Sequence, residues 1–146
     1  QQAYIQKNDW AQRVSTGLLL ANELRELTMH MPQHDPITGT GWWGPEPDET
    51  AVEHYDDLDD FDGAAGEGIT FSPPITALTE QVPDMPGWSQ QVWVENVLPN
   101  FVSMETPSPD NTTDLLRFTV RVLYQGPGDD QAREITRLTW VNAGGL

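Results

Sequence analysis

One long helical pattern at the start of the chain constrains the fold more than any other feature of the sequence. Over residues 1–31, apolar side chains recur three or four positions apart, as they do along one face of an α-helix. These positions are Tyr4, Ala11, Val14, Leu18, Ala21, Leu24 and Met31, with Leu20 and Leu27 widening the stripe. Pro32 ends the pattern because it cannot donate the next backbone hydrogen bond, and Gly17 weakens it by up to about 1 kcal/mol relative to alanine. Such a helix needs a second apolar surface to cover its stripe.

The last third of the chain is predicted to supply that surface as antiparallel strands. Residues 115–125 alternate between apolar and polar side chains, which is typical of a strand with one buried face. The apolar positions are Leu116, Phe118, Val120, Val122 and Tyr124. Residues 88–98 and 132–141 are predicted to form further strands, and the alternation of the second slips near Thr136–Arg137, which indicates a bulge. Residues 142–146 are predicted to form a flexible tail.

Between the helix and the sheet lies an acidic insertion, residues 32–87, that is rich in proline and glycine. A structureless loop of this length is unusual inside a domain. We therefore expect short helical turns at Asp48–Leu58 and at Ile75–Gln81, and a short strand at residues 69–71.

These elements predict an α+β fold. The chain has 146 residues, which suits a single domain with its own core. We expect a long N-terminal helix over residues 1–31, the acidic insertion over 32–87, and a three- to four-stranded antiparallel sheet over 88–146 that packs on the helix.

The charge of the chain excludes several classes of partner. Its net charge is -16, from 23 acidic and 7 basic residues, and no lysine or arginine lies between Glu26 and Leu116. Such a chain should repel phosphate backbones, so nucleic acid is not expected as a partner, and the middle of the chain should avoid anionic membranes. A high-salt habitat, a calcium-rich exterior and simple solubility remain open explanations. The absence of cysteine excludes disulfides and thiolate metal sites.

Five aspartates within seven residues form the most prominent candidate site. They are Asp56, Asp57, Asp59, Asp60 and Asp62. Calcium takes six to eight oxygen ligands, which carboxylates on a glycine-containing loop can supply. The candidate calcium ligands are Asp57, Asp59, Asp60 and Asp62. The alternative, which we favour at this stage, is a solvated acidic loop, or carboxylates that cap helices and pair with Arg117 or Arg121.

No other motif specifies chemistry. His30, His34 and His54 with Asp35 are a poor zinc candidate, because Pro32 interrupts the helical spacing, and exposed loop histidines are expected instead. The sequence holds no nucleophile elbow, phosphate-binding loop or dinucleotide fingerprint, so an enzyme is not expected.

Two adjacent tryptophans, Trp42 and Trp43, lie in the insertion. They could stack a sugar, but we expect them to pin the insertion to the core.

Several segments resemble the type IV pilins and the pseudopilins of type II secretion. They are residues 18–29 (LLLANELRELTM), 44–50 (GPEPDET), 55–63 (YDDLDDFDG), 87–95 (GWSQQVWVE) and 133–141 (REITRLTWV). The most specific is 55–63, which resembles a segment found after the helix in prepilin-like proteins, including minor pilins of the mannose-sensitive haemagglutinin type. The resemblance implies one long helix on an antiparallel sheet.

The resemblance also implies a function. It implies a non-enzymatic filament subunit in the cell envelope, on the periplasmic or extracellular side, whose partners are other pilin subunits. Before assembly, a hydrophobic half-helix behind a basic leader would anchor it in the inner membrane. This sequence shows no such half-helix, which we expect to reflect processing or truncation. It also lacks the C-terminal disulfide loop of many major pilins, which favours a minor pilin or a pseudopilin.

The Asp56 to Asp62 run would contact other subunits or cargo. The alternative function is a secreted calcium-dependent binding module, with the aspartates and the tryptophan pair holding a carbohydrate.

Overall fold

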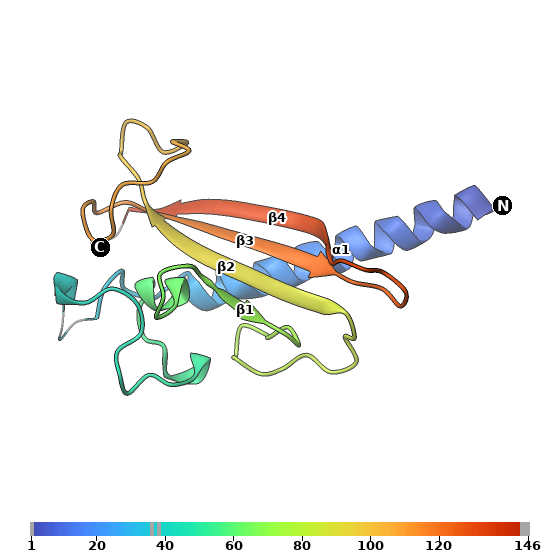
Figure 1. Ribbon diagram of the computed structural model, residues 1–146, viewed down its shortest axis with the longest axis horizontal. Helices are drawn as coiled ribbons and strands as arrows, with labels where there is room; N and C mark the ends of the chain where they lie inside the picture. Colours follow the sequence, from blue (N-terminus) through green and yellow to red (C-terminus); the bar gives the residue numbers. More distant parts are fainter. Residues whose placement is uncertain (1, 36, 38, 144–146) are drawn as a thin grey trace.

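The long helix lies along one face of a four-stranded antiparallel sheet (Figure 1). The structure is a computed structural model that describes residues 2–35, 37 and 39–143. The regular elements are α1 (Gln2–Thr28), β1 (Ile69–Phe71), β2 (Trp88–Asn96), β3 (Leu116–Tyr124) and β4 (Arg133–Asn142). The sheet order is β1-β2-β3-β4, a simple meander. The predicted α+β fold, with one helix packed on an antiparallel sheet, is therefore confirmed.

The strands follow the sequence pattern closely. The predicted apolar face of β3 is buried from Leu116 to Val122, and Tyr124 is partly buried beside it. The bulge falls one residue from the predicted place: Val122 pairs with Thr136 and Leu123 pairs with Glu134, so Ile135 is the extra residue of β4. The short strand at 69–71 is confirmed as β1. Of the predicted tail, Asn142 belongs to β4, and residues 144–146 lie outside the described residues.

The helix ends at Thr28, three residues before the predicted end. The Thr28 hydroxyl donates to the carbonyl oxygens of Leu24 and Arg25, and residues 29 and 30 form a turn. Proline also disfavours helical geometry in the residue before it, so Pro32 acts already on Met31.

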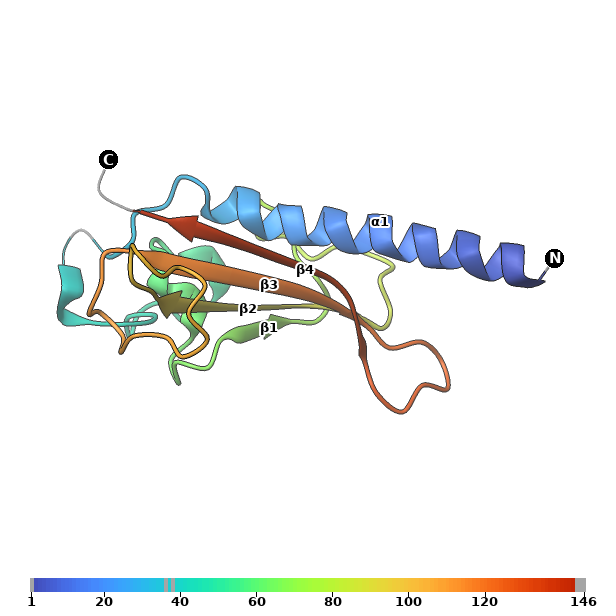
Figure 2. The same cartoon turned by 90° about the horizontal axis from the view of Figure 1, so that it is seen from above.

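The buried face of α1 differs from the predicted stripe. The residues that face the sheet are Gly17, Leu20, Ala21, Leu24 and Thr28. The prediction is wrong for Ala11, Val14 and Leu18, which are exposed. The first turns of α1 extend past the end of the sheet (Figures 1 and 2), and Leu18, which follows Gly17, lies on the side of α1 that faces away from β4. The side chain of Tyr4 lies outside the described residues.

The insertion covers the rest of the inner face of the sheet. It contains three short 3₁₀ turns: η1 (Gly39–Gly41), η2 (Val52–His54) and η3 (Asp59–Asp62). η2 lies inside the predicted turn at 48–58. The predicted helix at 75–81 is wrong, because Ile75 and Gln81 form a β-bridge and the Thr76 hydroxyl accepts from the amides of residues 78 and 80.

Gln90 joins three parts of the core. Its side chain points from β2 into the buried face and is fully buried. Nε2 donates to the carbonyl oxygens of Leu20 and Ile75, and Oε1 accepts from the amide of Ile75. One amide side chain therefore connects the sheet, the helix and the insertion.

We expect Gln90→Leu to lower the free energy of unfolding by about 2–4 kcal/mol, because it leaves the buried amide and carbonyl groups of Ile75 unpaired. Denaturant unfolding followed by tryptophan fluorescence measures the change. The matched control is Gln91→Leu, on the partly exposed outer face, which should cost less than about 1 kcal/mol. Equal losses for the two variants would contradict this role.

We expect Gly17→Ala to destabilise the protein by about 1–3 kcal/mol, although alanine is normally the better helix former. A Cβ atom at Gly17 would lie 2.6 Å from Thr136 Oγ1 and 3.0 Å from Ile135 Cγ2, so these side chains or β4 itself would have to shift. Ser15→Ala, on an exposed helical position, is the control and should be neutral or slightly stabilising. A more stable Gly17→Ala protein would show that the contact with β4 is loose.

Candidate functional site

The aspartate run lies inside the molecule. Asp57, Asp59, Asp60 and Asp62 are 1%, 1%, 0% and 3% exposed, and only Asp56 is exposed. The interpretation as a solvated acidic loop is therefore wrong.

The neighbouring apolar residues explain this burial. Leu58 and Phe61 both belong to the hydrophobic core, and residues three apart lie on the same side of a 3₁₀ turn. When these two side chains pack on the inner face of the sheet, the carboxylates between and beside them are buried as well.

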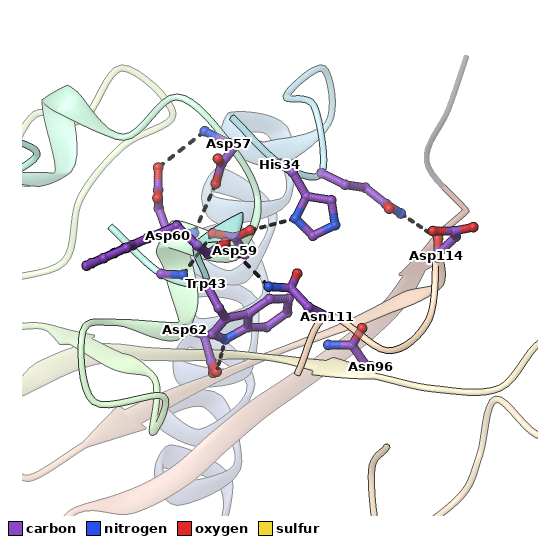
Figure 3. Close-up of polar contacts among 12 residues, drawn as sticks. His34, Trp43, Asp57, Asp59, Asp60, Asp62, Asn96, Asn111 and Asp114 are labelled. Carbon is purple, nitrogen blue, oxygen red and sulfur yellow. Dashed lines mark hydrogen bonds and ion pairs between the residues drawn. The ribbon is translucent and has the colours of Figure 1, made fainter. Parts of the chain in front are cut away.

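Asp59 and Asp62 hold the insertion in place. Asp62 accepts from the Trp43 indole at 3.0 Å and from the Val94 amide of β2 at 3.1 Å. Asp59 accepts from the Gly44 amide at 2.9 Å and pairs with His34 Nδ1 at 2.7 Å. Figure 3 shows Asp62 directed toward Trp43 and Asp59 toward His34.

Asp57 and Asp60 lie together on the other side of η3, away from Trp43 (Figure 3). Asp60 Oδ2 accepts from the amides of Asp56 and Asp57 at 3.0 and 3.2 Å. Asp57 Oδ1 accepts from the Asp60 amide at 3.3 Å. Asp60 Oδ1 is buried and has no hydrogen-bond partner within the described part of the chain.

Further carboxylates surround this pair. In each of three groups, one ligand atom per residue lies within 4.8 Å of the others: Asp35, Glu46 and Asp57; Glu46, Glu49 and Asp60; Asp56, Asp57 and Asp60. Two of the four predicted calcium ligands, Asp57 and Asp60, belong to these groups. Asp59 and Asp62 belong to none of the groups found among the described residues.

Sequence reasoning missed Glu46, Glu49 and Asp35 as members of this cluster. The first two come from the Gly44 to Thr50 segment, which lies ten or more residues before Asp60 and reaches it only by folding back. The one available signal was the accumulation of acidic residues in a stretch without lysine or arginine.

The electrostatic environment reflects this crowding. Burial, together with the nearby carboxylates, raises the pKa of Asp57 to about 8 and that of Asp60 to about 7. Burial likewise raises the pKa of Glu49 to about 8 and that of Asp59 to about 7. The charged forms are thus disfavoured where no cation compensates them.

The arginines do not neutralise the cluster, and the predicted pairing with Arg117 or Arg121 is wrong. Arg117 pairs with Glu95 at 3.0 Å, and Arg121 donates to Gln91 at 2.6 Å. Both arginines lie on the outer face of β3, because they alternate with its buried residues. The carboxylates lie on the opposite side of the sheet.

Of the three histidines, His34 contacts the aspartate run. His34 is partly buried against Asp59, contrary to the expectation of an exposed loop histidine, whereas His30 and His54 are exposed as expected. Burial lowers the pKa of His34, which favours its neutral form. The metal-capable groups found among the described residues contain no histidine.

The two tryptophans have different surroundings. Trp43 packs against the core and donates to Asp62, so its expected role in pinning the insertion is confirmed. Trp42 is 46% exposed and donates to the Pro45 carbonyl, so the same expectation is wrong for Trp42. No stacking between the two rings is found, and no observation favours a carbohydrate platform here.

No family model, curated protein or solved structure matches this chain. Within the described residues, no helix combines the length and the apolar composition needed to cross a bilayer.

We expect Trp43→Phe to lower the free energy of unfolding by about 1–3 kcal/mol, because it removes a hydrogen bond to a buried carboxylate that still needs a donor. Trp42→Phe is the matched control and should cost less than about 1 kcal/mol, since its ring is half exposed. Chemical denaturation followed by circular dichroism compares the two. Equal losses would contradict the assigned difference.

Proposed function

We propose that this protein is a non-enzymatic filament subunit, of the minor pilin or pseudopilin kind, that assembles through α1. One observation carries the proposal: the face of α1 that packs on the sheet continues toward the N-terminus as an apolar face, at Trp10 and Val14, that the described residues leave exposed.

The face follows alternating steps of four and three residues. Its members are Trp10, Val14, Gly17, Ala21, Leu24 and Thr28. The last four are buried against the sheet, whereas Trp10 and Val14 are 46% and 37% exposed. Figure 2 shows the first turns of α1 extending past the end of the sheet.

This spacing is the one by which helices pack against each other, with side chains at steps of three and four inserted between those of a partner. Large apolar side chains gain about 25 cal/mol for each Å² removed from water. The occupant we propose for the uncovered face is the corresponding helix of a neighbouring subunit. Assembly would thus complete a surface that the single chain covers only in part.

The sequence resemblance supports the same proposal. The helix, the insertion and the sheet follow one another in the order that a pilin-like subunit implies, and the segment 55–63 provides the most specific similarity. We therefore propose the cell envelope as its location, with other pilin subunits as partners.

The proposal predicts what the coding sequence contains before Gln1. It expects a short basic leader that ends in glycine, followed by an apolar segment with a glutamate near its start. An ordinary secretory signal peptide before Gln1 would contradict the filament proposal.

Substitution of the uncovered face tests the mechanism. In the full-length protein, Trp10→Lys combined with Val14→Lys puts two charges where a neighbouring helix should pack. We expect the filament-associated fraction to fall at least tenfold, measured by immunoblots of sheared surface filaments against whole cells. Because both side chains are exposed, thermal unfolding of the chain should change by less than about 1 kcal/mol.

Leu19→Lys is the matched control. Leu19 is 64% exposed and lies nine residues after Trp10, or two and a half helical turns, so it is on the opposite side of α1. This variant should enter filaments as the wild type does. If both variants assemble equally well, the uncovered face does not mediate assembly.

A further inference from the structure

We propose that Glu46, Asp57 and Asp60 form a calcium site inside the insertion, with Glu49 and Asp56 completing the ligand set. The site differs from the set of calcium ligands predicted from the sequence, because Asp59 and Asp62 bond to Gly44, His34, Trp43 and Val94 instead. It does not depend on the proposed filament function.

Asp60 Oδ1 is the atom that points to a ligand. Asp60 is fully buried, its Oδ2 accepts from two backbone amides, and its Oδ1 has no hydrogen-bond partner among the described residues. Buried carboxylate oxygens are costly unless they are hydrogen-bonded or coordinate a metal. Among the described residues no donor reaches this oxygen, and the side chains grouped with Asp60 are themselves carboxylates.

The three groups of carboxylates share their members. Glu46, Asp57 and Asp60 each belong to two groups, with ligand atoms within 4.8 Å of one another in each group. The ion pairs found among the described residues do not join Asp57 or Asp60 to a lysine or an arginine. A bound cation would compensate the charge of Asp57 and Asp60, whose carboxylates are buried close to each other.

The chemistry of the ligand set favours calcium. The groups consist of carboxylates alone, which are the ligands of hard cations, and they contain no histidine or cysteine that would favour zinc. Five carboxylates offer enough oxygens for the six to eight that calcium takes, whereas magnesium is usually held by one or two carboxylates and several waters.

The ion would connect segments that are distant in the sequence. Glu46 and Glu49 come from the start of the insertion, and the aspartates come from residues 56–60 beside the core. Binding would therefore fasten the outer part of the insertion to η3, which packs on β2.

Calcium titration of the wild-type chain is the first experiment. After removal of cations with a chelator, calcium at about 100 times its Kd should raise Tm by about 5–10 °C, and isothermal titration calorimetry should show saturable binding. Sodium chloride at equal ionic strength should give a much smaller shift. An equal shift with sodium chloride, or an equal response to magnesium, would overturn the calcium assignment.

Asp60→Asn tests the central ligand. The introduced amide can still accept from the backbone amides of Asp56 and Asp57, and its NH₂ group can donate to neighbouring carboxylates. We therefore expect a folded variant whose Tm in chelator is at least that of the wild type, whose calcium affinity falls at least tenfold, and whose calcium-induced shift is lost.

Two control variants test alternatives to this site. One alternative is that the overall negative charge attracts calcium, and the other is that calcium binds the ligands predicted from the sequence. Glu53→Gln removes an exposed carboxylate of η2, and Asp62→Asn removes a buried carboxylate that belongs to none of the three groups. Both should bind calcium within about twofold of the wild type. A loss of binding in Asp62→Asn with retention in Asp60→Asn, or an absence of saturable binding in the wild type, would overturn the proposal.

Discussion

The packing of Leu58 and Phe61 against the inner face of the sheet is the interaction on which the rest of the insertion depends. Both side chains are 1% exposed or less and belong to the same core as the helix residues Leu20 and Leu24. They are the two residues of the segment 56–62 that are not aspartate. Burial of the apolar pair therefore forces the adjacent carboxylates out of water, where each needs a donor or a cation.

The chain meets that need in two ways. Asp59 and Asp62 accept hydrogen bonds from the insertion and from β2, so their carboxylates connect the acidic segment to the rest of the insertion and to the sheet. Asp57 and Asp60 instead meet glutamates and each other. One short acidic segment thus contains structural carboxylates on one side and a candidate ion site on the other.

The helix shows a similar division along its length. Its C-terminal half is covered by β3 and β4, closely enough that Gly17 leaves no space for a Cβ atom. Its N-terminal half continues the same face without cover, at Trp10 and Val14. The covered half contributes Leu20, Ala21 and Leu24 to the core, and the uncovered half is the basis of the proposed assembly.

The sequence by itself determined the elements whose signals are local. The spacing of apolar residues located α1 and its end near Pro32, and the alternation from Leu116 to Val122 identified the buried face of β3. Both signals are read within one element, so no knowledge of neighbours was required. Only the tertiary structure decided which part of the helix is covered, that the aspartates are buried, and which of them gather with Glu46. Those outcomes depend on contacts between residues far apart in the chain, and a carboxylate looks the same in a sequence whether it meets water, an amide or another carboxylate.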